Sequence, residues 1–327
     1  MTAIVKMGVI GLGAIGDRIL KSIQAEDGIQ ITAVCDVNEQ LVKSMTEEYK
    51  VKGYLDYREM LEQAALDIVY VAVPPKYHEK IVLDVIEANK HVLCEKPLAN
   101  SVDEGKRMLA AAEQKGLVHA MHFPLNYQAP LNEFERRIKE GYIGELRRIR
   151  LVMHFPHWPR LWQQNDWVGG KEQGGYVLEV GVHWIQALQR IFGSVAQVKS
   201  QLQFPNDPQR CENSIVAELS LTDGTPVMID GLSDISGDEL IEFAAYGSEG
   251  TIMLRNWRSL WLGKNGQPLE EVTVDSESAT RMMKEIAKAV NRVPANIYDF
   301  RAGLHAQYVL DALRHPPHSN WQQLDTE

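Results

Sequence analysis

Cysteines are scarce in this 327-residue sequence, which contains three of them: Cys35, Cys94 and Cys211. An odd number of scattered cysteines favours neither a disulfide framework nor a zinc site, and it is typical of the reducing cytoplasm, where we expect the protein to reside. Long apolar runs are also missing. The longest, near residues 68–75, is far short of the roughly 18 residues that span a bilayer. The first residues lack the charged start and apolar stretch of a signal peptide.

Basic residues are also fewer than acidic residues. Lys and Arg total 34 against 44 Asp and Glu, so the formal net charge is -10. This balance argues against binding to nucleic acid or to an anionic membrane, which requires a basic face. The content of 45% hydrophobic and 24% charged residues is ordinary for a soluble globular protein. Because single cores rarely grow beyond roughly 250–300 residues, the length favours two domains.

The first third of the chain alternates short apolar runs with longer helical patterns. The pattern predicts strands at 7–10, 31–35, 68–73 and 91–94, and helices at 15–25, 39–49, 79–89 and 101–115. Strands alternating with helices imply right-handed βαβ units and a doubly wound parallel sheet. We therefore expect an α/β dinucleotide-binding (Rossmann) domain over residues 1–121.

A glycine-rich turn lies where that sheet would begin. Its G-x-G-x-x-G pattern consists of Gly11, Gly13 and Gly16 and encloses Ala14 and Ile15. In such turns the first glycine permits the tight turn, the second admits a pyrophosphate, and the third lets helix pack on strand. Asp36, 20 residues after Gly16, is placed to accept hydrogen bonds from an adenosine ribose and to repel a 2′-phosphate. These residues predict NAD as cofactor in preference to NADP. The alternative is a plain glycine turn followed by an aspartate that starts a loop.

A second candidate site is Cys94-Glu95-Lys96-Pro97, which ends a predicted strand. Ligands of parallel sheets bind at the carboxyl edge of the strands. Near a nicotinamide, Lys96 would donate a hydrogen bond to a substrate oxygen and stabilise alkoxide character. The alternative is a solvated lysine beside a turn proline.

After residue 120 the pattern changes to consecutive strands with turn signals between them. Strands are expected at 146–154, 195–204, 214–221, 225–230, 240–246 and 250–254, and helices at 131–140, 279–290 and 300–314. Short turns between consecutive strands predict antiparallel hairpins. We expect residues 122–327 to form an α+β domain with a large, mostly antiparallel open sheet. Whether its C-terminal helices pack back on the first domain stays open.

One predicted helix of this half, residues 176–192, is apolar around most of its circumference and carries a narrow polar stripe. The stripe holds Glu179, His183, Gln186 and Arg190 at i, i+4, i+7 and i+11. Polar groups on a buried helix must meet partners, water or a ligand, since unpaired burial costs about 1–3 kcal/mol per group. The stripe therefore indicates either a binding site or a satisfied structural network.

An aromatic and polar stretch at 154–167 contains three of the seven tryptophans. Flat apolar faces among hydrogen-bonding groups suit a sugar or cyclitol, so we expect a substrate wall here. Its members are Trp158, Arg160, Trp162, Asn165 and Trp167. A subunit-interface loop is the alternative, because Trp and Arg also favour interfaces. Without a nearby cluster of carboxylates or cysteines, the two histidines of this stretch predict no metal site.

Together these segments resemble the glucose-fructose oxidoreductase/inositol dehydrogenase (Gfo/Idh/MocA) family of NAD(P)-dependent oxidoreductases. The similar motifs are the glycine turn, the loop with Val73, Pro74 and His78, the Glu95-Lys96-Pro97 signature, and Gly174-Gly175 through His183. Segments 138–146 and 246–251 resemble its entry into the second domain and a late turn of that domain's sheet. The resemblance covers nearly the whole chain.

The resemblance implies a site and a reaction. The residues that would lie at the cofactor are Val73, Pro74, His78, Glu95 and Lys96. Lys96 and His183 would act on the hydroxyl of a secondary alcohol as hydride moves to the nicotinamide, and either could transfer the proton. Glu179 would orient the substrate or His183.

The chain departs from the family pattern at three positions. Glu179 replaces the usual Asp, Gln186 stands where Asp is frequent, and Tyr127 stands where many members have Arg. Because Tyr127 and Gln186 belong to the expected substrate site, these departures bear on substrate identity. A non-sugar carbonyl or dihydrodiol is the alternative substrate class. A non-catalytic dinucleotide sensor is the alternative function, which the presence of both Lys96 and His183 argues against.

The expected partners are a small polyol or sugar and further copies of this chain. One-sided sheets normally need covering, and the resembled family pairs the faces of its second-domain sheets. We therefore expect a homodimer or homotetramer through that sheet.

Overall fold

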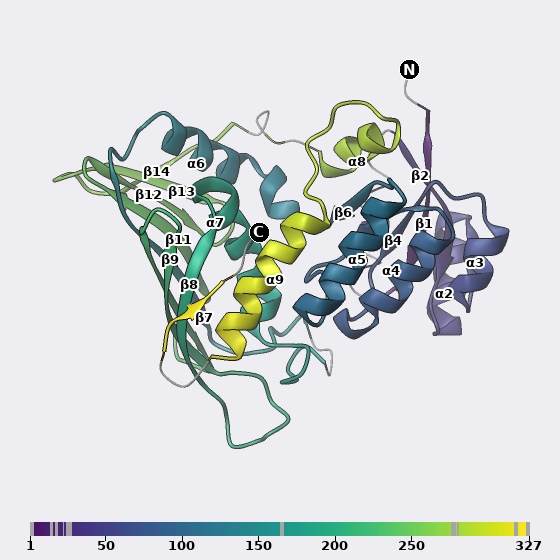
Figure 1. The fold of residues 1–327 in the computed structure, drawn as a ribbon, viewed down its shortest axis with the longest axis horizontal. Helices are drawn as coiled ribbons and strands as arrows, with labels where there is room; N and C mark the ends of the chain where they lie inside the picture. The colour runs from purple at the N-terminus through teal and green to yellow at the C-terminus, as the bar shows by residue number, and fades with distance from the viewer. Residues whose placement is uncertain are drawn as a thin grey trace. The chain divides into compact units, whose positions relative to one another are not determined.

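The computed structural model describes residues 3–13, 16, 19–21, 23, 28–163, 167–275, 279, 281–316 and 320–324. Two compact units make up the chain. Met1–Phe123 and Arg281–Leu304 form the first, and Pro124–Thr280 and His305–Glu327 form the second. Each unit is built around its own sheet, and the elements carry the labels of Figure 1. Ala14 and Ile15 of the glycine turn, and most of the helix predicted at 15–25, lie outside the described residues.

The sheet of the first unit has the strand order β3-β2-β1-β4-β5-β6, and all its pairs are parallel. Its strands are β1 Val5–Ile10, β2 Ile29–Cys35, β3 Lys52–Tyr54, β4 Ile68–Val71, β5 His91–Cys94 and β6 His119–Met121. The order reverses between β1 and β4, which is the switch point where doubly wound sheets bind dinucleotides. The predicted Rossmann fold is confirmed.

Helices connect these strands. They are α2 Glu39–Tyr49, the short α3 Tyr57–Gln63, α4 His78–Glu87 and α5 Val102–Gln114, with the 3-10 turn η1 Pro75–Tyr77 before α4. The α5 helix begins with the expected cap, because Ser101 Oγ accepts a hydrogen bond of 3.3 Å from the backbone N–H of Glu104. Helix α8, Met282–Val290, follows far along the chain and contacts β2. The sequence patterns missed β3, β6 and α3, which are too short for their periodicity to stand out.

The sheet of the second unit contains nine strands among the described residues. Its order is β14-β13-β12-β11-β7-β10-β9-β8-β15, and each pair is antiparallel except β7 with β10. The strands are β7 Leu146–Phe155, β8 Val195–Gln203, β9 Ser214–Leu221, β10 Pro226–Ser233, β11 Leu240–Gly247, β12 Gly250–Arg255, β13 Ser259–Lys264, β14 Glu270–Val272 and β15 Gln322–Gln323. The predicted large, mostly antiparallel sheet is confirmed, with β13 and β14 added beyond β12 at one end and β15 added beyond β8 at the other.

Helices pack against one face of this sheet. They are α6 Ala129–Lys139, the π-helical turn η3 Val177–Gly181 that leads into α7 Val182–Phe192, and the part of α9 (Phe300–Arg314) that belongs to this unit, with the 3-10 turn η2 Pro124–Tyr127 before α6. Phe134 of α6 and Trp184 of α7 both contact Phe243 of β11, with ring centroids 5.4 and 5.6 Å apart. Leu313 of α9 accepts a hydrogen bond of 2.8 Å from Ser200 of β8.

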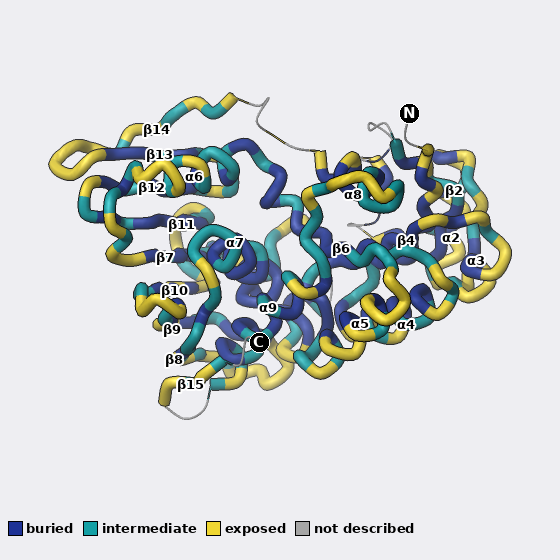
Figure 2. Tube along the Cα trace, turned by 45° about the horizontal axis from the view of Figure 1, so that its top comes forward, coloured by how far each residue is buried: buried dark blue, intermediate teal, exposed yellow. Residues whose placement is uncertain are grey.

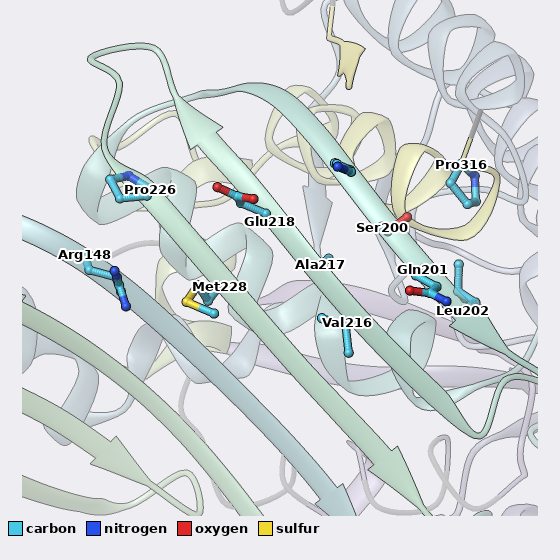
Figure 3. Close-up of a pocket in the computed structure, with 11 residues that line it drawn as sticks. Arg148, Ser200, Gln201, Leu202, Val216, Ala217, Glu218, Pro226, Met228 and Pro316 are labelled. Atoms are coloured by element: carbon cyan, nitrogen blue, oxygen red, sulfur yellow. The ribbon is translucent and has the colours of Figure 1, made fainter. Parts of the chain in front are cut away.

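The opposite face of the sheet is open to solvent. Along β9 and β10 buried and exposed residues alternate, as the tube in Figure 2 shows. Val216 and Met228 are 59% and 42% exposed on this face. A hollow of about 730 Å³ lies here, and Arg148, Val216 and Met228 are among the residues that line it (Figure 3). The open face therefore presents apolar and basic side chains together.

None of the helices within the described residues is long and apolar enough to cross a membrane. Cys35, Cys94 and Cys211 are all buried free thiols, and burial raises the pKa of Cys35 and Cys211 to about 12. They pack as small apolar residues.

Candidate active site

The glycine turn follows β1 and has the geometry of a dinucleotide loop. Gly11 has a φ of 95°, and a Cβ there would lie 2.5 Å from the carbonyl oxygen of Ala72. A Cβ on Gly16 would overlap the carbonyl oxygen of Gly11, whereas a Cβ on Gly13 would meet no described atom within 4 Å. The first and third glycines are therefore required by the backbone, and Gly13 leaves open space into which a pyrophosphate fits.

Asp36 follows β2 and is tied to this turn. Its Oδ2 accepts a hydrogen bond of 2.7 Å from the backbone N–H of Leu12, and its Oδ1 accepts one of 2.9 Å from that of Asn38. These bonds hold the carboxylate against the glycine turn. Each oxygen can accept a further hydrogen bond, so the residues present fit an adenosine ribose.

His78 joins the two loops that the sequence assigns to the cofactor. Its fully buried ring places Nε2 2.8 Å from the carbonyl oxygen of Val73, and Nδ1 2.9 Å from that of Pro97. Burial lowers the pKa of His78 and outweighs the carbonyl groups that favour the charged ring. His78 therefore links the loop containing Val73 and Pro74 to the segment after Lys96.

Glu95 lies in a buried polar cluster at the carboxyl edge of the first sheet. It accepts hydrogen bonds from the hydroxyl of Tyr70 and, over 3.1 Å, from the backbone N–H of Lys96. His122 Nδ1 lies 2.7 Å from its carboxylate. Burial alone would raise the pKa of Glu95, but the opposing effects of His122, Lys96 and Tyr70 lower it to about 2. The cluster therefore anchors the backbone that carries Lys96.

Sequence reasoning missed Tyr70 and His122. Tyr70 is the one polar side chain in the otherwise apolar strand β4, and a buried hydroxyl needs a partner. That requirement could have indicated from the sequence that Tyr70 has a polar partner. No short-range pattern links His122 to Glu95, so the sequence did not indicate His122.

In the second unit, Glu179 and His183 lie on consecutive turns of the segment η3–α7. The sequence predicted one continuous α-helix, whereas residues Val177–Gly181 form a π-helical turn. Such turns occur frequently at functional sites. Glu179 is buried, and Gln163 Nε2 lies 3.5 Å from its Oε2. Gln163 thus connects the predicted substrate wall to the carboxylate of Glu179, the candidate catalytic residue. The sequence analysis had not identified Gln163 as a site residue.

The remaining residues of the polar stripe form a hydrogen-bonded network. Arg190 donates to the backbone and side-chain oxygens of Asn126, each over 3.0 Å, and pairs with Glu135. Gln186 Oε1 accepts a hydrogen bond of 2.5 Å from Asn126 Nδ2. Tyr127, next to Asn126 in η2, is buried. The substrate roles of Tyr127 and Gln186 stay predictions.

The tryptophan-rich segment divides into buried and exposed residues. Trp158 is buried, and its indole N–H donates to the carbonyl of Val168 over 3.3 Å. Arg160 forms two hydrogen bonds of 2.8 Å with Glu239. Trp162 is 60% exposed. Trp167 is half-buried, and Asn165 lies outside the described residues. Among the described members of the predicted wall, Trp162 is therefore the most exposed, with the Arg160 guanidinium 5.9 Å from its ring centroid.

Glu212, which the sequence analysis did not identify, holds the start of the segment η3–α7. Its Oε1 accepts a hydrogen bond of 2.9 Å from the backbone N–H of Val177. Gly175 has a φ of 100°, and a Cβ there would overlap the Glu212 carboxylate. Burial raises the pKa of Glu212 to about 7. The close approach of this carboxylate is the physical reason for glycine at position 175.

Two family models match this chain. The model for the NAD-binding Rossmann domain of the GFO/IDH/MocA oxidoreductase family covers residues 5–123, and the family's C-terminal domain covers residues 132–253. The chain belongs to this oxidoreductase family. The resemblance deduced from the motifs is thereby confirmed.

Three known proteins illustrate the relationship. Myo-inositol 2-dehydrogenase of Thermotoga maritima is 28% identical over 189 residues, which cover 58% of this chain and 55% of that enzyme. The structure of levoglucosan dehydrogenase with NADH and L-sorbose has a TM-score of 0.86 at 18% identity, with 99% of each chain covered. A 3-ketoreductase from Actinomadura kijaniata with NADP and TDP-benzene has a TM-score of 0.82 at 23% identity, with 95% of this chain and 97% of that chain covered. At these identities the two structures establish the shared fold.

Proposed function

We propose that this oxidoreductase transfers a hydride between a nicotinamide dinucleotide and a secondary alcohol or ketone of a sugar, sugar derivative or cyclitol. The observation that carries the proposal is the glycine turn, in which Gly11 and Gly16 are required by the backbone while Gly13 leaves space for a pyrophosphate. The bound cofactor would supply the hydride chemistry.

We propose NAD as the preferred cofactor. The Asp36 carboxylate is held at the glycine turn by Leu12 and Asn38. A fixed negative charge there attracts ribose hydroxyls and repels a 2′-phosphate. NADP is the alternative cofactor.

We assign the proton chemistry to Lys96 and His183. Lys96 follows the anchored carboxylate of Glu95 and would donate a hydrogen bond to the reacting oxygen. His183 would take the hydroxyl proton during oxidation and return it during reduction, since histidine is the side chain that most often serves as a general base in enzymes. The buried Glu179, one turn earlier in the helix, would orient the substrate or the imidazole.

The substrate class follows from the tryptophan-rich segment and the relatives. The exposed ring of Trp162 offers a flat apolar face beside polar groups, which suits a sugar or cyclitol ring. The named relatives act on inositol and on levoglucosan, in line with this class.

We also propose a homodimer or homotetramer that covers the open face of the second sheet. Val216, Met228 and Leu232 are exposed along its central strands, and apolar residues gathered on one face favour association. A cytoplasmic location agrees with the three free, buried thiols.

A substrate panel tests the proposed function. The purified protein is incubated with NAD or NADP and a series of sugars, cyclitols, non-sugar alcohols and dihydrodiols, while absorbance of the reduced cofactor is followed. We expect turnover with a sugar or cyclitol. Turnover confined to dihydrodiols or non-sugar alcohols would refute the substrate class, and failure to bind either cofactor in calorimetry would refute the proposal as a whole.

A further inference from the structure

The turn between β12 and β13 holds a tryptophan in an unfavourable backbone conformation. Asn256 and Trp257 both lie in the left-handed region, with φ values of 44° and 71°. The N–H of Arg258 donates to the carbonyl of Arg255 over 3.0 Å and closes the turn. Turns with positive φ at both central residues favour Asn-Gly, because glycine has no Cβ to clash. Asparagine suits the first position, whereas tryptophan at the second costs free energy that glycine would not.

The surrounding structure maintains this strained conformation. Asn256 pairs in both directions with Ile241 of β11. Its backbone N–H donates to the Ile241 carbonyl over 2.8 Å, and its Oδ1 accepts from the Ile241 N–H over 2.9 Å. The turn is therefore pinned to the neighbouring strand, and Trp257 has a defined direction.

The Trp257 side chain meets the helix that carries the proposed catalytic base. Its ring lies 5.6 Å from the imidazole of His183, nearly perpendicular at 81°. On the same helix the fully buried Trp184 lies 5.0 Å away, tilted by 35°. These separations fall within the range of attractive aromatic contacts. Trp257 thus bridges the strained turn and His183.

Burial of apolar surface does not by itself explain why tryptophan occupies position 257. Trp257 is only partly buried, so its apolar contribution is smaller than that of a core tryptophan. Backbone strain in a non-glycine residue persists where function or packing requires that side chain. The two aromatic contacts of Trp257, with Trp184 and with His183, distinguish this position, and the second bears on the proposed proton chemistry.

We propose that Trp257 is a positioning residue for His183: its ring fixes the plane of the imidazole and shields one side of it from water. This inference rests on the proposed function, in which His183 transfers the substrate proton. A general base needs a defined orientation toward its proton, and small misplacements of reacting groups cost up to about a hundredfold in rate. Trp257 itself is not required to touch the reacting atoms.

Three variants of the full-length protein test the proposal. Trp257→Gly removes the ring and relieves the backbone strain, and Trp257→Phe keeps an aromatic face. Trp261→Ala is the matched control, because Trp261 lies on the same hairpin but packs against Arg255, with the guanidinium 5.1 Å from the ring centroid. For each variant we would measure kcat, KM, the cofactor Kd, thermal stability, and the rate at which diethyl pyrocarbonate modifies His183, read by mass spectrometry.

We expect Trp257→Gly to lower kcat by about tenfold while KM and the cofactor Kd change little. Modification of His183 should become several-fold faster, and Trp257→Phe should restore most of both properties. The Trp261→Ala control should retain the parent's kcat and labelling rate. Thermal stability of Trp257→Gly should fall little, because loss of the ring is offset by relief of strain.

Several results would overturn the proposal. They are an unchanged labelling rate in Trp257→Gly, a kcat that stays near the parent's value, a rise in KM alone, or a phenylalanine variant as impaired as the glycine one. If the parent protein turns over none of the panel compounds, the proposed function fails. The labelling rates of the three variants then still decide whether Trp257 covers and orders the imidazole.

Discussion

The buried carboxyl of Glu212 leads to a stability prediction whose sign depends on pH. Its pKa is about 7 in the folded protein against 4.5 for an ordinary glutamate. The folded state therefore holds this proton more tightly than the unfolded state between these two values, and stability falls as pH rises through that window. The cost is absent below pH 4.5 and complete above pH 7. Its size is about 3 kcal/mol, from about 1.4 kcal/mol per pKa unit.

Replacing Glu212 by glutamine imitates the protonated carboxyl at every pH. The amide oxygen can still accept the hydrogen bond that Val177 donates to Glu212 over 2.9 Å. We therefore expect Glu212→Gln to be more stable than the parent by up to about 3 kcal/mol near pH 8, and nearly equal to it near pH 5. For a unit of this size that gain corresponds to a rise of about 6–12 °C in melting temperature.

Differential scanning calorimetry at the two pH values measures this difference. Glu270→Gln is the matched control, because Glu270 is an exposed glutamate on β14 of the same unit and lies outside the hollow of the open face. It should show little change at either pH. Equal effects of Glu212→Gln near pH 5 and pH 8 would refute the reasoning, because the benefit would then not come from a buried charge. Destabilisation near pH 8 would show that the carboxylate itself is required there.

Three further predictions concern the first unit and the proton chemistry. Asp36→Ala should weaken NAD binding and narrow the NAD/NADP preference in calorimetric titrations, and an unchanged ratio of the two Kd values would mean that this carboxylate does not contact the ribose. Glu95, with a pKa lowered to about 2, stabilises the fold above pH 4.5, and this stability is lost as pH falls toward 2. Glu95→Gln should therefore cost about 3 kcal/mol near neutral pH in denaturant unfolding, a loss that shrinks in acid. An equal loss at both pH values would point to packing instead. Lys96→Ala and His183→Ala should each lower kcat far more than cofactor affinity, and near-full activity of either variant would show that its assigned role is wrong.

The sequence predicted the overall fold well because its signals are local and repeated. Apolar runs at 68–73 and 91–94 became β4 and β5, and the helical patterns at 39–49 and 300–314 match α2 and α9. The elements that were missed are short, such as β14 and β15, or carry too little periodicity, such as α3. A strand of two or three residues is defined by its neighbours in the sheet, which a local pattern cannot show.

The candidate site was predicted less completely, because its supporting contacts are long-range. The motifs led directly to Gly13, Asp36, Lys96 and His183. The sequence could not show that Gln186 bonds to Asn126, 60 residues away, or that Trp257 meets His183. Each of these contacts depends on how the chain folds between the two residues. A polar stripe on a buried helix indicates that partners exist without naming them.

The two buried glutamates, Glu95 and Glu212, show why side-chain chemistry is the last property that a sequence reveals. Both follow a buried cysteine, and both are nearly inaccessible to water. Burial raises the pKa of each, but His122, Lys96 and Tyr70 reverse the effect at Glu95 and leave it at about 2. Glu212 has chiefly backbone N–H groups as partners, and its pKa reaches about 7. Of the two Cys-Glu pairs, one thus places a fixed negative charge next to Lys96, and the other places a titrating carboxyl that holds the backbone of Val177. The difference comes from the partners at each site, which a local pattern does not show.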